Sequence, residues 1–520
     1  MTAAHLRILV LGLAFLLAGC GGTHAGRSRA TAGPLGGTAV VPAPAVVQPK
    51  GELRVALGIG LPGTLDAFKD GTQLIRLGAG ETLTRVTPDQ QIEPWLAESV
   101  TPVDASTWRV VLRKNARFWD GSPVTPEAVI ASFQRTWDTL PDASTLIGKE
   151  TRISALDATT LEFKTPRPAG NLPNSLAGPQ FVVQKPGTEG SILTGPYRPV
   201  HLDVDHEVTL EAFADHWAGP PPIARISVKL VQDANARLLA LQAGDVDLVY
   251  GLPPELAQNL PSDLERAIVP STRIDYLLFN TARLPFSERA VRQATSLAID
   301  RKALNQAALD GLGAELNGVL PPLPGSGPAA MQGSDLSRAR QLLDDAGWKA
   351  GPDGVRMKDG KRLAFTLYSY PGRTELTSIA VALQGQFKTL GYDVQIQQVQ
   401  QITPVLMSGN FDASMFSLNA LPTGDPLYVF AVSFSQSGSG NSGKYSNARL
   451  DTLMDQLRTE PDLAKRRLLA DQAQAIVTAE VPNAYLLAPP RIDAYKRGKL
   501  QGYAPHPNDL YLIDRSISVQ

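Results

Sequence analysis

One strand–helix–strand segment constrains the fold of this chain more than any other feature of its sequence. Leu363 to Tyr370 and Asp393 to Val399 are rich in residues that favour β-strands, and Glu375 to Leu390 between them has the spacing of a helix. This order predicts two parallel strands joined by a right-handed crossover. Because ligands of such folds bind beyond the carboxyl ends of the strands, we expect Tyr370 and Arg373 at the edge of a cleft.

A second segment, residues 118–135, predicts a turn followed by a helix. Asp120-Gly121 is typical of a turn, because Gly tolerates positive φ and Asp can bond its own backbone. Thr125 has the chemistry of an N-cap, and Pro126 suits the first helical position. Apolar residues then recur at helical spacing, at Val129, Ile130 and Phe133.

The same residues carry a resemblance. The order Phe-x-Asp-Gly-x-Pro-x-Thr-x-x-x-Val-x-x-Ser-Phe-x-Arg, starting at Phe118, resembles the signature of the bacterial extracellular solute-binding proteins of family 5. More matching blocks follow in order, among them Asn280-Thr281, Pro285-Phe286, Val291-Arg292-Gln293-Ala294 and Ala298-Ile299-Asp300-Arg301. The family comprises the large peptide- and nickel-binding receptors of ATP-binding-cassette (ABC) importers, so the resemblance implies a receptor of that kind.

The mixture of strands and helices predicts an α/β (mixed α+β) fold of two lobes, because late elements return to the first half of the chain. We expect lobe 1 to comprise residues 51–82, 192–276 and 484–520, and lobe 2 to comprise residues 277–483. The resemblance implies an extra subdomain on lobe 1, residues 83–191, and a ligand cleft between the lobes, as in periplasmic binding proteins.

Composition sets the outer limits of this interpretation. At 520 residues the chain is too long for one core, and its 43% hydrophobic and 19% charged residues are an ordinary globular mixture. The net charge is −1, from 49 basic and 50 acidic residues. This balance gives no electrostatic reason to expect a nucleic-acid partner.

The N-terminus has the pattern of a bacterial lipoprotein. Residues 1–19 read as a signal peptide, with an apolar run from Ile8 to Leu16 that is too short to span a bilayer comfortably. Leu17-Ala18-Gly19-Cys20 resembles a lipobox, in which Cys20, the single cysteine of the chain, is acylated. Residues 20–50 are rich in Gly, Ala, Thr and Pro and read as a flexible linker. We therefore expect a lipid-anchored protein on the periplasmic or extracellular face of the cell envelope.

Three other patterns indicate sites less strongly. Gly58 to Gly63 fits the dinucleotide fingerprint G-x-G-x-x-G, but no clear helix starts at Pro62. Gly438 to Lys444 has the spacing of a phosphate-binding loop, but Tyr445 stands where a Ser or Thr would bind Mg²⁺. A metal site fails on spacing for the three histidines of one segment, His201, His206 and His216.

Five residues are candidate ligand contacts. Peptide-binding members of the family use the Asp of an Asp-Pro loop to pair with the peptide's α-amino group, and Asp425 occupies that position. Arg373 offers a planar fork for a carboxylate, although a solvated loop arginine is the alternative. Leu61 lies in a turn that faces the cleft in the family, and Asn419 lies in the segment where members often place a Trp. Tyr370 completes the set through its place at the cleft edge.

These expectations leave three functions open. In the first, two lobes close around a peptide or a similar small zwitterionic solute and deliver it to an ABC permease in the cytoplasmic membrane; the protein is a monomer without a cofactor or metal. The second is a receptor of the same fold for a nickel chelate or another small solute, although nickel-binding relatives use a His after the Asp-Pro loop and residues 427–445 contain none. The third is a secreted hydrolase, but no G-x-S-x-G, H-E-x-x-H or Cys/His pattern is present.

We predict that Cys20→Ala abolishes acylation, because no other thiol is available to carry the lipid. Cells labelled with palmitate should incorporate the label into the wild-type protein and into a Ser28→Ala control, but not into the Cys20 variant. Label that persists on the Cys20 variant would contradict the anchor.

Overall fold

The structure, a computed structural model, describes four stretches of the chain: residues 48–188, 190–322, 333–371 and 373–520. The predicted signal peptide, Cys20 and nearly all of the predicted linker lie outside the described residues. The first strand begins at Lys50, the last residue assigned to that linker. Within the described stretches, no helix combines the length and apolarity that crossing a membrane requires.

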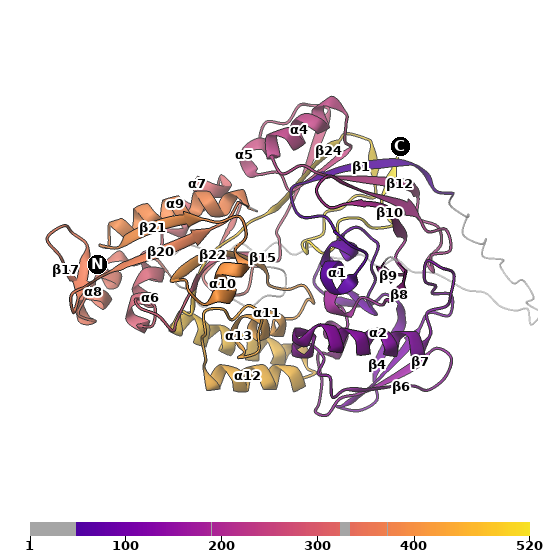
Figure 1. Cartoon of the computed structure of the whole chain (residues 1–520), viewed down its shortest axis with the longest axis horizontal. Helices are drawn as coiled ribbons and strands as arrows, with labels where there is room; N and C mark the ends of the chain where they lie inside the picture. Colours follow the sequence, from indigo (N-terminus) through magenta and orange to yellow (C-terminus); the bar gives the residue numbers. More distant parts are fainter. Residues whose placement is uncertain (1–47, 189, 323–332, 372) are drawn as a thin grey trace, which may run out of the picture. The chain divides into compact units, whose positions relative to one another are not determined.

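A seven-stranded sheet forms the centre of lobe 1 and includes a strand from near the C-terminus (Figure 1). In spatial order its strands are β10 (Tyr197–Asp203), β11 (Glu207–Ala212), β12 (Ile223–Leu230), β1 (Lys50–Leu57), β13 (Leu248–Tyr250), β24 (Arg491–Lys496) and β14 (Leu264–Val269). The central strand β1 runs parallel to β12 and β13. Val55 and Leu57 face one core, and Ala56 faces another beneath α4 (Ala234–Ala243). Because both faces of β1 are covered near its carboxyl end, Val55, Ala56 and Leu57 form an unbroken apolar run.

A six-stranded sheet organises lobe 2. In spatial order its strands are β16 (Ala314–Glu315), β23 (Asn483–Ala488), β15 (Arg273–Phe279), β22 (Ala413–Asn419), β20 (Ala364–Ser369) and β21 (Asp393–Gln398). Strands β20 and β21 are parallel and are joined by α9 (Thr374–Lys388). The strand–helix–strand unit predicted from the sequence is thus confirmed.

Helices cover both faces of this second sheet (Figure 1). One face packs on α6 (Arg289–Leu297), α7 (Arg301–Leu309), α8 (Leu336–Asp345) and α9, and the other on α11 (Leu427–Phe434), α12 (Ala448–Thr459) and α13 (Leu463–Glu480). Alternate residues of β15 divide between the two cores, with Leu277 in the first and Tyr276 in the second. The strand period of two therefore places every buried apolar residue of β15 against a helix layer.

Residues between β1 and β10 build a smaller sheet. Its strands, in spatial order, are β4 (Ala97–Pro102), β5 (Thr107–Leu112), β7 (Thr160–Lys164) and β6 (Arg152–Ala155). The helix α2 (Pro126–Thr139) packs on it through Phe133. The Thr125 hydroxyl accepts the Ala128 backbone N–H at 3.3 Å, and Gly121 has a φ of 82°. The predicted turn and N-capped helix are confirmed.

Short elements complete the described chain: α1 (Ala67–Arg76), β2 (Thr84–Val86), β3 (Ile92–Pro94), α3 (Leu172–Ser175), β8 (Lys185–Gly187), β9 (Gly190–Ile192), α5 (Pro254–Ala257), β17 (Lys349–Ala350), β18 (Arg356–Lys358), β19 (Lys361–Arg362), α10 (Thr403–Ser408), β25 (Leu500–Gln501) and β26 (Ser518–Val519).

The chain passes between the two large sheets at two places. The first crossing lies between Val269, the end of β14, and Arg273, the start of β15. The second lies between Ala488, the end of β23, and Arg491, the start of β24. Strand pairing therefore puts residues 273–276 and 484–488 in the lobe 2 sheet, a few residues away from the predicted division. We retain the domain division as a proposal, with its boundaries at these two crossings.

We predict that Gly195→Ala destabilises lobe 1. A Cβ at this position would lie 2.4 Å from the carbonyl oxygens of Gly78 and Ala79, and backbone cannot move aside cheaply. The expected loss is about 2 kcal/mol of unfolding free energy, measured by chemical denaturation. The control is Gly385→Ala in α9, where a Cβ meets nothing within 4 Å, and which should be neutral or slightly stabilising. Equal stability of the two variants would contradict the packing argument.

Candidate ligand-binding site

A cavity of about 150 Å³ lies where loops of the two lobes meet. Gly251 to Glu255, which follow the lobe 1 strand β13, form one wall. Arg373 and Glu375, at the start of α9 in lobe 2, form another. The two crossings between the sheets, at Ser271 to Arg273 and Pro489 to Arg491, also line the cavity. The carboxyl ends of parallel strands from both lobes thus border one cavity, where ligands of such sheets bind.

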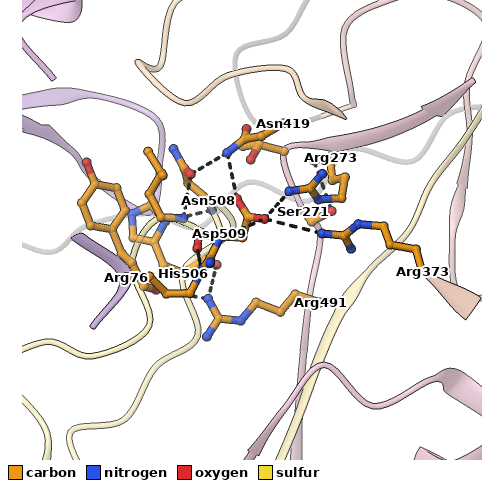
Figure 2. Close-up of polar contacts among 12 residues, drawn as sticks. Arg76, Ser271, Arg273, Arg373, Asn419, Arg491, His506, Asn508 and Asp509 are labelled. Atoms are coloured by element: carbon orange, nitrogen blue, oxygen red, sulfur yellow. Dashed lines mark hydrogen bonds and ion pairs between the residues drawn. The ribbon is translucent and has the colours of Figure 1, made fainter. Parts of the chain in front are cut away.

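The carboxylate of Asp509 joins the two lobes beside this cavity (Figure 2). Arg273 donates a hydrogen bond to its Oδ2, and guanidinium nitrogens of Arg76 and Arg373 lie 3.8 Å from the same oxygen. Asn419 donates from Nδ2 to Oδ1 at 2.9 Å. Arg76 and Asp509 belong to lobe 1, whereas Arg373 and Asn419 belong to lobe 2.

Strand register explains why these partners meet. Arg273 is the first residue of β15 and Asn419 the last of β22, and the two are opposite each other in the antiparallel pair. Their side chains reach toward the C-terminal segment, where Asn508 accepts from Asn419 Nδ2 at 2.8 Å. Asn508 in turn donates to the carbonyl oxygens of Leu421 and Pro422, at 3.2 and 3.1 Å. The C-terminal segment of lobe 1 is therefore hydrogen-bonded to the end of a lobe 2 strand.

The arginines keep Asp509 ionised. Burial alone would raise the pKa of this carboxyl, but the charges of Arg273, Arg76 and Arg373 hold the pKa well below its usual range. The pKa of Arg273 is raised in return, because the charge of Asp509 outweighs the effect of burial. The cluster is a charged contact at all physiological pH values.

A second buried carboxyl lies on the same strand. Asp275 is fully buried, and neither of its oxygens has a hydrogen-bond partner among the described residues. Burial, followed by the charge of Glu375, raises its pKa to about 7, although Arg373 and Arg273 oppose the shift. The raised pKa favours the neutral form of Asp275 relative to an ordinary carboxyl group.

Four of the five predicted ligand residues have different surroundings in the structure. Arg373 lines the cavity, and Asn419 binds Asp509 beside it. Tyr370 is half-buried between the two cores of lobe 2, and burial raises the pKa of its hydroxyl. Leu61 is 3% exposed and packs in the lobe 1 core. Of these four, only Arg373 is part of the cavity lining.

Asp425, the fifth predicted residue, is engaged elsewhere. Its Oδ2 accepts two hydrogen bonds from Arg466 of α13, one of them from Nε at 3.1 Å. Its Oδ1 accepts the backbone N–H of Leu427, the first residue of α11, at 2.8 Å. The Asp425 and Arg466 side chains are only 6% and 4% exposed. In this structure the carboxylate is a buried internal partner, and a ligand ammonium would have to displace Arg466 to reach it.

The sequence matches known proteins along most of its length. The sequence profile described as bacterial extracellular solute-binding proteins, family 5, matches residues 91–441. This range is more than half of the chain. The protein belongs to family 5.

Individual members of the family are distant in sequence but cover nearly the whole chain. The oligopeptide-binding protein AppA of Bacillus subtilis is 27% identical over 99% of this chain and 98% of its own length. The nickel-binding protein NikA of Staphylococcus aureus is 25% identical over 86% of this chain and 90% of its own length. The solved structure of that NikA, in complex with Ni(L-His)₂, has a TM-score of 0.81 and covers 90% of this chain and all of the other. The α/β two-lobe fold is therefore confirmed.

Family membership also establishes the general function. As a family 5 solute-binding protein, the chain is the extracytoplasmic substrate-binding component of an ABC importer. The competing motifs lack their structural context: Gly58 to Gly63 leads to a helix only at Ala67, and Gly438 to Lys444 follows a helix instead of a strand. No group of three metal-ligating side chains occurs in the described residues.

The charged cluster around Asp509 contains three residues that the sequence patterns did not indicate as ligand contacts. Asp509 is the central one, and Arg76 and Arg273, which bind it, are 433 and 236 positions away. Local periodicity of the sequence cannot indicate a contact between residues so far apart in the chain. The residue pair Asn508-Asp509, polar and next to the apolar Leu510, was the one available signal.

We predict that Asp425→Asn lowers stability more than it lowers affinity. Removing one charge of a buried pair leaves Arg466 uncompensated, so unfolding free energy should fall by about 3 kcal/mol in chemical denaturation. The control, Asp455→Asn, breaks an exposed pair with Arg458 and should cost less than about 1 kcal/mol. Unchanged stability with lost ligand binding would instead identify Asp425 as a ligand contact.

Proposed function

We propose that this family 5 receptor captures peptides, or a similar small zwitterionic solute, by closing its two lobes over the cavity at the crossings. The observation that carries the proposal is the pair Arg373 and Glu375, which line the cavity two residues apart. Arg373 offers a guanidinium to a ligand carboxylate, and Glu375 offers a carboxylate to a ligand ammonium. A zwitterion carries both groups.

Arg373 has donors to spare for this role. Its side chain is 24% exposed, and its one ion pair among the described residues, with Asp509, spans 3.8 Å. A contact of that length leaves the planar fork free to bind two carboxylate oxygens. Glu375 makes no ion pair within the described part of the chain and lies in the first turn of α9. Negative charge in the first turn of a helix is also favoured by the helix dipole.

Closure follows from a ligand that contacts both lobes. Arg373 and Glu375 belong to lobe 2, whereas Tyr250 and Glu255 line the lobe 1 wall. A solute that touches both walls binds the closed arrangement more tightly than an open one, and only that difference shifts the population. The permease would then distinguish loaded from empty receptor by its shape.

The remaining expectations complete the proposal. We propose that Cys20 carries a lipid that anchors the mature monomer to the bacterial membrane, next to its permease, and that the receptor performs no catalysis. Relatives of this chain support the ligand class: besides AppA, a glutathione-binding protein of Pectobacterium atrosepticum is 27% identical over 79% of the chain. The similarity to NikA supports a metal-chelate receptor as the second candidate.

The test is calorimetry with defined probes. Of the dipeptides Ala-Ala, Ala-Gln and Ala-Glu, at least one should bind the wild-type protein. Arg373→Gln should weaken that binding by about tenfold or more, because a charged hydrogen-bond partner contributes about 1.5–3 kcal/mol.

The matched control is Arg362→Gln, which removes an exposed lobe 2 arginine paired with Asp353 and should leave affinity unchanged. Equal affinity of the Arg373 variant would contradict the site. Binding of nickel–histidine with no response to any dipeptide would contradict the peptide assignment and select the second candidate.

A further inference from the structure

Arg237 is a buried cation in the lining of the same cavity. The residue is 5% exposed and lines the cavity beside Tyr250 and Gly251. Its guanidinium donates to three carbonyl oxygens at the carboxyl ends of strands, those of Val231 at 2.7 Å, Gln232 at 2.9 Å and Gly251 at 2.9 Å. These bonds satisfy donors, but carbonyl groups carry no net charge.

No carboxylate neutralises this arginine within the described residues. It forms no ion pair there, and its Nε has no hydrogen-bond partner. The negative charge of Asp233 opposes the effect of burial on the pKa of Arg237. Asp233 is exposed, however, and its carboxylate caps α4. Burial accordingly lowers the pKa of Arg237, since a cation removed from water without a counter-ion is destabilised.

The position of Arg237 is fixed by the packing around it. A Cβ at Gly58 would lie 2.2 Å from one guanidinium nitrogen, so the loop after β1 is closed over the side chain. The same side chain is held from below by the ends of β12 and β13. Arg237 therefore cannot turn outward to solvent while the strands keep this arrangement.

The charged groups around the cavity sum to a small positive charge once their ion pairs are assigned. Arg491 pairs with Asp493, and Arg273 pairs with Asp509. Arg76 and Arg373 share that same Asp509 at 3.8 Å. Arg237 has no such partner. Two lining carboxylates also have no ion pair in the described residues: Glu375, and Glu255, which is exposed to screening water. Three arginines therefore face two carboxylates, and one positive charge is left over. One zwitterion, with one carboxylate and one ammonium, does not change this balance.

We infer that the solute carries a second acidic group besides its main carboxylate, and that this group is bound on the Arg237 side of the cavity. The inference rests on the proposed function and narrows it to acidic zwitterions, such as peptides or amino-acid conjugates with an acidic side chain. A ligand anion supplies the missing counter-charge, and a neutral isostere leaves the buried cation as it was. Specificity then comes from the difference in binding free energy between the acidic ligand and its neutral isostere.

The experiment compares dipeptides that differ only in charge. By calorimetry at pH 7, Ala-Glu should bind wild-type protein at least about tenfold tighter than Ala-Gln, and Ala-Lys should bind most weakly. The advantage of Ala-Glu should shrink as salt is raised, though less than for exposed charges. Equal binding of Ala-Glu and Ala-Gln would overturn the inference while leaving the peptide receptor intact.

Variants assign the preference to Arg237. In Arg237→Gln the ratio of the two affinities should fall to about one, whereas Arg237→Lys, which keeps the charge, and Arg198→Gln, an exposed control, should retain it. A merely structural role would weaken both ligands equally and leave the ratio unchanged, which would overturn the assignment. If the Gln variant does not fold, the wild-type comparison decides.

A non-peptide probe separates this inference from the proposed function. If no dipeptide binds, the peptide assignment fails, and thermal unfolding with glutarate and its uncharged diamide then tests the charge argument alone. Stabilisation by glutarate and not by the diamide would support a preference for acidic solutes. Stabilisation by neither, or by both equally, would overturn it.

Discussion

The structure depends on one buried carboxylate that serves both lobes. Asp509 cannot be removed from water unpaired, and its partners come from three separate parts of the fold: Arg76 in α1, Arg273 at a crossing, and Arg373 at the start of α9. Each partner satisfies part of the desolvation cost of the others. The arrangement of the lobes at the cavity is therefore tied to a charge balance, and a charged solute acts on that balance directly.

Other contacts between the lobes lie away from the cavity. Gly170 of the lobe 1 subdomain donates its N–H to the Arg458 carbonyl at 3.0 Å, and a Cβ there would lie 2.4 Å from the Glu460 carbonyl oxygen. Asn174 donates to the Thr423 carbonyl at 2.9 Å. These hydrogen bonds join neutral groups, so they stabilise the closed arrangement whatever the charge of the solute. The charged cluster, in contrast, links closure to the solute's chemistry.

Local sequence patterns predicted the helices and strands, whereas contacts between residues far apart in the sequence determine the site. The β20–α9–β21 unit and the capped α2 follow from periodicity and turn chemistry, which act within a few residues. Arg373 could be predicted because it lies between β20 and α9, at the carboxyl end of a strand of that unit. Asp425 was assigned a ligand role by resemblance, yet its partner Arg466 lies 41 positions away on another helix. Asp509 and Arg237 gain their importance from burial and from charges that no local pattern reports.

Small-angle X-ray scattering of the wild-type protein tests the central claim most directly. In the proposed mechanism the two lobes close because a solute bridges the charged groups at the crossings. A saturating concentration of the dipeptide that binds best should therefore reduce the radius of gyration relative to the unliganded protein. An unchanged radius with proven occupancy would contradict a mechanism of closure around the ligand.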